Sequence, residues 1–257
     1  MSPNKVYFIT GASRGIGLEL TKALALTPSN TVIATARNPA KAHALLALAT
    51  EFSNIKLTTL DVSSQESIDT LNKTLPELCE SGIDYYISNA GISNPATVAP
   101  VLKVTDRQLW LDHYATNTLG PIFVAQKLYP YLAKRETKVM FIVTSKAGSI
   151  TQFVPFSSSC YGSTKVATNF SVKQMANELK PEGFTVVAVH PGLVLTDMVK
   201  AATEGGNKNV PPETIEMMMK KAITPDVSAK LQVELLHKLA KEDTGKFFSY
   251  DGSEVAW

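Results

Sequence analysis

Short apolar stretches alternate with longer amphipathic stretches along most of the chain. The short stretches are rich in β-branched and aromatic residues, a composition typical of strands that are buried in a sheet. They predict seven strands, at residues 5–10, 31–36, 56–60, 84–88, 138–144, 185–190 and 246–249. Between them, apolar residues recur at helical spacing and predict helices at residues 15–26, 39–51, 65–79, 107–132, 159–179 and 226–240.

This alternation of strands and helices predicts an α/β fold of the Rossmann type. The expected architecture is a doubly wound parallel sheet of about seven strands, with helices on both faces. Because no repeat or linker divides the 257 residues, we expect a single Rossmann-type domain over residues 1–257. The polar stretch at 192–212 is too long for a routine connection, and it predicts a substrate loop or lid over about 192–222.

Composition and charge exclude several classes of partner. The 25 Lys and Arg residues nearly balance the 23 Asp and Glu residues, and no run of like charge is present. The chain therefore lacks the basic patch that binding to nucleic acid or an anionic membrane requires. Two cysteines cannot form a disulfide framework, and we predict no metal site. With no export signal and no apolar run near the ~20 residues that span a bilayer, we expect a cytoplasmic protein.

A glycine cluster follows the first predicted strand and opens the first predicted helix. Gly11, Gly15 and Gly17 would permit a tight turn, and the helix N-terminus would direct unpaired N–H groups toward a pyrophosphate. The spacing differs from the common G-x-G-x-x-G pattern, and a plain strand-to-helix turn is the alternative. The strand–turn–helix context favours a dinucleotide site.

The end of the second predicted strand carries Arg37, twenty residues after Gly17. An acid near this place would bind the ribose 2′-OH of NAD, whereas arginine favours the 2′-phosphate of NADP. No Asp or Glu occurs from residue 31 to residue 40, and Arg14 in the glycine cluster adds a second cation. The pattern predicts NADPH as the cofactor, although Arg37 taken alone could be an ordinary solvated charge.

Tyr161 and Lys165 lie four residues apart and therefore on one face of a predicted helix. A nearby cation favours the phenolate, so we expect Lys165 to lower the pKa of Tyr161 and to make it a usable acid or base. Ser145 follows the apolar strand at 138–144, at the edge where open parallel sheets bind ligands. Its hydroxyl could hold a carbonyl oxygen, or it could simply cap the turn before Gly148.

Taken in order, these motifs resemble the short-chain dehydrogenase/reductase family over nearly the whole chain. The resemblance implies a catalytic set of four residues, Asn117, Ser145, Tyr161 and Lys165. It also implies contacts to the cofactor from Gly11, Ser13, Arg14, Gly15, Ile16, Gly17, Arg37, Asp61, Val62, Asn89, Ala90, Gly91, Tyr161, Lys165, Pro191, Gly192, Val194 and Thr196.

The family also implies a role for each catalytic position. Tyr161 would be the general acid, and Ser145 would polarise the carbonyl. Lys165 would bind the nicotinamide ribose and lower the pKa of Tyr161, while Asn117 would help to hold a water in the proton relay. The stretch at 191–196 would orient the nicotinamide ring. A homodimer or homotetramer, formed through the helices at 107–132 and 159–179, is a further expectation from the resemblance.

Two departures from the family pattern bear on the prediction. Ser88 stands where many members have a further Asn. Tyr161 lies 16 positions after Ser145, a longer spacing than in many members, and the additional residues at 152–156 could line the substrate pocket. This longer spacing resembles the carbonyl-reductase branch that includes the sniffer-type and fungal ketoreductase proteins.

The apolar residues at 150–156 and beyond predict a hydrophobic or aromatic ketone or aldehyde as substrate. Met217, Met218 and Met219 at helical spacing are more typical of core packing, and His190 is interpreted as a structural residue. Two alternatives stay open: an alcohol dehydrogenase that runs in the oxidative direction, and a dinucleotide-binding sensor without turnover. The intact Tyr161 and Lys165 argue against the sensor.

Overall fold

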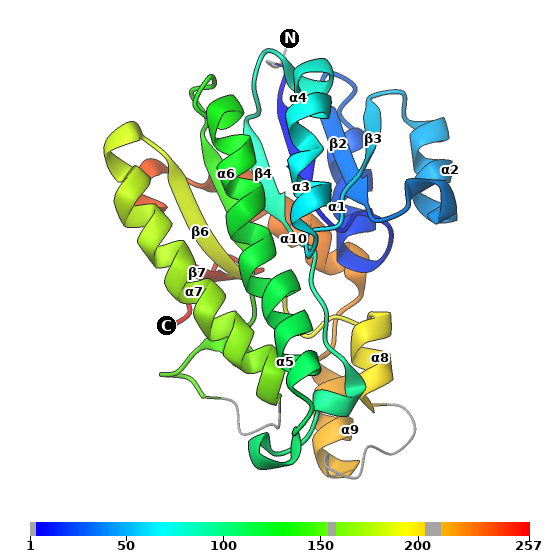
Figure 1. The fold of residues 1–257 in the computed structure, drawn as a ribbon, viewed down its shortest axis with the longest axis vertical. Helices are drawn as coiled ribbons and strands as arrows, with labels where there is room; N and C mark the ends of the chain where they lie inside the picture. Colours follow the sequence, from blue (N-terminus) through cyan, green and yellow to red (C-terminus); the bar gives the residue numbers. More distant parts are fainter. Residues whose placement is uncertain (1–3, 154–157, 204–211) are drawn as a thin grey trace.

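The computed structural model describes residues 4–153, 158–203 and 212–257. Its strands form one parallel sheet in the order β3-β2-β1-β4-β5-β6-β7 (Figure 1). The strand bounds are β1 Val6–Ile9, β2 Thr31–Ala36, β3 Ile55–Thr59, β4 Tyr85–Ser88, β5 Val139–Val143, β6 Thr185–His190 and β7 Phe247–Ser249. The seven predicted strands and the Rossmann-type fold are thus confirmed.

Ten α-helices lie within the described residues. They are α1 Gly15–Ala25, α2 His43–Glu51, α3 Gln65–Asp69, α4 Leu71–Cys79, α5 Arg107–Tyr114, α6 Gly120–Leu132, α7 Ser159–Leu179, α8 Asp197–Thr203, α9 Pro212–Lys221 and α10 Pro225–Lys238. In Figure 1, α4, α6 and α7 lie in front of the sheet, with α1 and α10 behind it.

Side chains of each strand alternate between two apolar clusters, one on each face of the sheet. Along β1, Phe8 packs into the cluster under α4, α6 and α7, whereas Ile9 packs into the cluster under α1, α2 and α10. Both side chains are fully buried. A strand that is covered on both faces needs apolar residues at every position, which is why the strands read as continuous apolar runs.

The helix predicted at 107–132 is interrupted. Between α5 and α6, residues Ala115–Leu119 form a π-helical turn, designated η4. Pro121 has no N–H to donate to the carbonyl of Asn117 four residues earlier, so this carbonyl needs another partner. Thr168 Oγ1 of α7 donates to it at 2.8 Å. The helix predicted at 65–79 is likewise two helices, α3 and α4.

The order of the strands reverses at β1. The next strand in sequence, β2, lies on one side of β1, and β4 lies on the other side. Ligands of open α/β sheets bind at the carboxyl edge beside such a switch point. The helices α5, α8 and α9 lie at this edge, at the lower end of Figure 1. The edge is therefore where a functional site is expected.

Candidate active site

The predicted motifs meet at the carboxyl edge of the sheet. A Cβ placed on Gly11, after β1, would lie 2.8 Å from the Cα of Ala90, after β4. A Cβ on Gly15 would lie 3.3 Å from Thr196, after β6, and one on Gly91 would lie 3.3 Å from Asn117 Oδ1. Segments separated by up to 181 residues in sequence therefore line one site.

The glycine loop is a tight turn with no room for side chains on its inner side. Gly11 and Gly15 have φ angles of 70° and 56°, in the left-handed region that favours glycine. A Cβ on Gly17 would lie 2.2 Å from the carbonyl oxygen of Gly11. The loop thus brings bare backbone and a helix N-terminus together, which fits a pyrophosphate.

Thr10 and Asn89 hold this loop against the end of β4. Thr10 Oγ1 accepts hydrogen bonds from the backbone N–H groups of Asn89 and Ala90, each at 3.1 Å. Asn89 Nδ2 donates to the carbonyls of Thr10 and Gly11, also at 3.1 Å. Thr10 was not singled out from the sequence, although its hydroxyl at the end of a buried strand was a signal for a structural role.

We expect Gly17→Ala to weaken dinucleotide binding at least about tenfold. In an ordinary helix alanine would be stabilising, but here its Cβ would overlap the Gly11 carbonyl and push the loop apart. Titration of NADPH fluorescence measures the effect, with the exposed Lys22→Ala in the same helix as control. Unchanged affinity in Gly17→Ala would show that the tight turn is not needed for binding.

The two arginines of the predicted nucleotide end lie in different surroundings. Arg37 is exposed after β2 and has no ion pair within the described residues. Arg14, at the N-terminus of α1, pairs with Asp197 of α8 at 3.0 Å. Both side chains of this pair are largely exposed, so the pair itself contributes at most about 1 kcal/mol. Asp197 was not singled out from the sequence.

Asp61 and Val62 follow β3 at the same edge. Asp61 Oδ1 accepts from both the N–H and the hydroxyl of Ser63, and the Val62 side chain is buried. The backbone N–H of Leu60 donates to Ala36 at the end of β2. These two predicted cofactor contacts therefore lie beside the strand that leads to Arg37.

Tyr161 and Lys165 lie on α7 as predicted, but the pKa of Tyr161 moves in the unexpected direction. Burial raises the pKa of the phenol, while a hydrogen bond with Ser145 acts to lower it. The predicted lowering is wrong for the protein alone, because desolvation outweighs the hydrogen bond with Ser145. At neutral pH Tyr161 is thus a protonated phenol, the form that can donate a proton.

Lys165 is buried beside this phenol. Its Nζ lies 5.6 Å from the centre of the Tyr161 ring and donates to the carbonyl of Val143 at 3.1 Å. Burial lowers the pKa of Lys165 from 10.5 to about 8, because a charged ammonium loses its hydration there. Negative charge near this nitrogen would favour its protonated form.

Ser145 has the capping role that the sequence left open, and its role toward a carbonyl oxygen stays a prediction. Its Oγ caps the short turn after β5 by accepting from the N–H of Ala147 at 3.1 Å. The Ser145 hydroxyl is also hydrogen-bonded to Tyr161. His190 of β6 supports the next residue, since Nδ1 accepts from the N–H of Lys146 at 3.3 Å. Burial lowers the pKa of His190 to about 4, so the ring is neutral, in line with a structural residue.

Asn117 lies in the π-helical turn, with its side chain fully engaged. Oδ1 accepts from the N–H of Ile92 at 2.8 Å, and Nδ2 donates to the carbonyl of Ile92 and to Thr164 Oγ1. The amide therefore fixes the chain after Gly91. π-Helical turns are frequent at functional sites because they redirect one side chain without ending the helix.

The stretch after β6 is held from two directions. The hydroxyl of Ser228 in α10 donates to the carbonyl of Pro191 at 2.6 Å, and Gly192 has a φ angle of 88°. Val194 forms an isolated parallel bridge with Ile223, which closes the base of the segment predicted as a lid. Residues 204–211 of that segment lie outside the described residues.

The methionines of α9 differ from expectation. The side chains of Met217 and Met219 are 53% and 44% exposed, so the interpretation as core packing is wrong for these two. Nothing in the sequence distinguishes a helix that packs into the core from one at the rim of a site. The wall predicted at 152–156 is described only as far as Phe153, and residues 154–157 lie outside the described residues.

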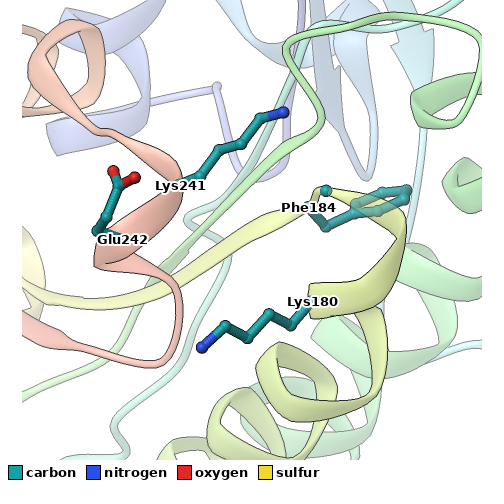
Figure 2. A pocket seen from close by; sticks show the side chains of 5 residues that line it. Lys180, Phe184, Lys241 and Glu242 are labelled. Carbon is teal, nitrogen blue, oxygen red and sulfur yellow. The ribbon is translucent and has the colours of Figure 1, made fainter.

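A pocket of about 330 Å³ lies at the opposite edge of the sheet, where β6 begins (Figure 2). It is lined by Lys180, Gly183, Phe184, Lys241 and Glu242. It contains none of the predicted site residues, so this pocket is separate from the candidate active site. No cluster of metal-binding side chains and no helix able to cross a bilayer occur among the described residues.

Comparison with known proteins gives consistent matches. The family model described as short chain dehydrogenase matches residues 5–207. An uncharacterized oxidoreductase of Saccharomyces cerevisiae is 44% identical over 255 residues, covering 96% of each chain. A short chain dehydrogenase of Penicillium aethiopicum is 34% identical and covers 97% of this chain and 98% of its own.

Two solved structures have the same fold over almost their full lengths. The NADPH-bound carbonyl reductase from chicken fatty liver has a TM-score of 0.86 and 26% identity, covering 99% of this chain and 95% of its own. The carbonyl reductase Sniffer of Drosophila melanogaster has a TM-score of 0.84 and 27% identity, covering 99% of this chain and all of its own.

Proposed function

Because the chain belongs to the short-chain dehydrogenase family of oxidoreductases, we propose that it is an NADPH-dependent carbonyl reductase. The proposed substrate is a hydrophobic or aromatic ketone or aldehyde. The observation that carries this proposal is the meeting of Ser145, a protonated Tyr161 and a buried Lys165 beside the glycine loop. A phenol, a hydroxyl and an ammonium in this arrangement suit proton transfer to a carbonyl oxygen.

The residues present fit a dinucleotide. The inner side of the loop at Gly11 and Gly17 would be filled by a Cβ, so only backbone can approach a pyrophosphate there. Asp61 and Val62 would contact the adenine, Asn89 to Gly91 would line the ribose side, and Pro191 to Thr196 would contact the nicotinamide. Ser13 and Ile16 belong to the loop itself. NADPH, when bound, would supply the hydride.

Each catalytic side chain would then have a defined task. Ser145 would donate a hydrogen bond to the carbonyl oxygen, and Tyr161 would donate its phenolic proton to the same oxygen. The ammonium of Lys165, 5.6 Å from the ring centre, would stabilise the phenolate that remains. Asn117 would hold the chain after Gly91 in position, and its family role in a proton relay stays a prediction.

The direct test is the initial rate of NADPH oxidation by the purified protein with a panel of aromatic and α-dicarbonyl compounds. Turnover with NADPH and a far lower rate with NADH would support the proposal. Tight binding of NADPH without reduction of any carbonyl would contradict it and would favour a dinucleotide-binding sensor. Faster turnover of alcohols with NADP⁺ at neutral pH would instead favour the oxidative direction.

Replacing Arg37 is expected to reverse the choice of cofactor. In Arg37→Asp, a carboxylate would repel the 2′-phosphate and could accept from a ribose 2′-OH, so kcat/KM for NADPH should fall about 100-fold while that for NADH rises. Exposed Arg107→Asp, at the start of α5, is a matched control for the change in charge. An unchanged NADPH/NADH ratio in Arg37→Asp would contradict the role assigned to Arg37.

Three further parts of the prediction stay proposals. Residues 192–222 would serve as the substrate lid, since the Val194–Ile223 bridge ties its two ends together. Self-association would use α5 and α6, within 107–132, together with α7. Leu111 and Tyr114 of α5 and Phe170 of α7 are exposed apolar side chains. The cytoplasm would be the compartment.

A further inference from the structure

The chain that leads from Ser145 toward α7 is fixed by contacts from three distant parts of the molecule. His190 accepts from the N–H of Lys146, and Asn169 Nδ2 of α7 donates to the carbonyl of Gly148 at 3.0 Å. A Cβ on Gly148 would lie 2.6 Å from the carbonyl carbon of Lys165, so this turn is pressed directly onto α7. These contacts end at Gly148, before the apolar residues begin.

Residues 255–257 supply the third set of contacts. The hydroxyl of Ser149 donates to the carbonyl of Ala256 at 2.6 Å and accepts from the N–H of Gln152 at 2.9 Å. The N–H of Thr151 donates to the carbonyl of Trp257 at 2.9 Å. Ser149 is only 2% exposed, so its hydrogen bonds are shielded from water.

The 255–257 segment is itself firmly anchored. The N–H of Val255 donates to Phe247 of β7 at 2.7 Å, and the Trp257 ring lies 5.4 Å from the ring of Phe247. Lys173 of α7 places its Nζ 5.4 Å from the centre of the Trp257 ring. The segment therefore connects the last strand of the sheet to the chain that follows Ser145.

The side chains that this connection holds in place are apolar and open to solvent. Ile150 is 71% exposed and Phe153 is 75% exposed, on either side of Thr151 and Gln152. An apolar side chain on a mobile loop would tend to turn inward, because burying it is worth about 1.5–3 kcal/mol. Here the hydrogen bonds of the Ser149 hydroxyl and of the Thr151 N–H fix the direction in which the chain runs.

We propose that the contact between Ser149 and residues 255–257 is a positioning element that sets the enzyme's selectivity for large apolar carbonyl substrates. It would do so by holding Ile150 and Phe153, five and eight residues after Ser145, in fixed places. Ser149 and Trp257 are then positioning residues, and neither touches the reacting atoms. This inference rests on the proposed reductase function.

Ser149→Ala and Trp257→Ala test the inference, with Ser171→Ala as the matched control. Ser171 also uses its hydroxyl for one backbone carbonyl, that of Ala167, but it lies within α7 and away from this contact. Ser149→Thr and Trp257→Phe keep the hydroxyl and the ring and should restore the parent behaviour. Melting temperatures of all variants separate a general loss of stability from the proposed effect.

The first readout is hydrogen exchange at the Thr151 amide. Neither alanine substitution removes its acceptor, so faster exchange there reports that the two segments have separated. We expect at least tenfold faster exchange at the Thr151 amide in Ser149→Ala and Trp257→Ala. In Ser171→Ala the exchange rate should not change. Unchanged exchange at Thr151 would overturn the inference whether or not the protein reduces carbonyls.

The second readout is the ratio of kcat/KM for the largest and smallest carbonyl compounds that the parent reduces. We expect this ratio to fall about tenfold in the two alanine variants, through KM for the large compound, with KM for NADPH unchanged. Equal losses for both compounds would overturn the selectivity role and leave a purely structural contact. If the parent protein reduces no carbonyl compound, the proposed function is wrong, and the selectivity role is wrong with it. The hydrogen-exchange result still shows whether the contact orders the chain.

Discussion

Tyr161→Phe is expected to lower kcat for carbonyl reduction by about 10²–10⁴-fold, the usual contribution of a positioned general acid. Phenylalanine keeps the ring beside Lys165 and Ser145 but lacks the proton that the carbonyl oxygen must receive. Because burial raises the pKa of Tyr161, the parent phenol stays protonated through the neutral range. The variant therefore loses the acid itself.

Steady-state rates with saturating NADPH and the best carbonyl of the panel measure this effect. NADPH affinity, measured by fluorescence titration, should stay within about twofold of the parent, since the ring is retained. Tyr114→Phe, on the exposed side of α5, is the control for removing a phenolic hydroxyl. If Tyr161→Phe retained more than a tenth of the parent kcat, another group would have to be the acid.

Lys165→Met is expected to act in opposite directions on activity and on stability. Activity should fall at least about 100-fold, because the phenolate of Tyr161 loses its neighbouring cation. The free energy of unfolding at pH 7 should rise, by up to about 3 kcal/mol, the equivalent of a pKa lowered from 10.5 to about 8. Methionine fills a similar volume without a charge to desolvate, at the cost of the hydrogen bond to Val143.

The pH dependence of stability identifies the cause. Between pH 8 and pH 10.5 the unfolded chain keeps the Lys165 proton while the folded protein has released it, so this group makes the parent more stable as the pH rises. Below pH 8 both states are protonated, and the full cost of burying the charge is present. Urea unfolding across this range should show that the free energy of unfolding rises with pH in the parent and in the exposed control Lys230→Met. The rise should be smaller in Lys165→Met. A variant less stable than the parent at pH 7 would contradict this account of Lys165.

The inner strands were predictable because both faces of the sheet are covered there, which leaves a continuous apolar run at strands such as β5. The break at η4 was not, since a π-helical turn keeps the chain helical and changes only the spacing of its hydrogen bonds. Pro121 was the local signal, but its effect depends on Thr168 in α7, a partner that lies 51 residues from Asn117 in sequence. Helix spacing alone carries no information about that contact.

The candidate site also has parts that the sequence predicts and parts that it does not. Residue types and order were enough to select Tyr161, Lys165 and Ser145, because each type has a distinct chemistry. The partners that hold them, such as the carbonyl of Val143 for Lys165, come from the backbone and have no signature in the sequence. The direction of the Tyr161 pKa was mistaken for a related reason: the neighbouring charge is visible in the sequence, whereas the depth of burial is not.

The order of the strands also determines how the site forms during folding. β1 pairs with β2 and also with β4, where Tyr7 lies beside Tyr85, so the central pairing closes a loop of more than 70 residues. Pairings of such high contact order form slowly, since the entropy of closing the loop is lost before the contacts are gained. The glycine loop and the segment after β4 meet only across this central pair. A refolding chain can therefore contain most of its helices and local strand pairs before it has a place for a dinucleotide.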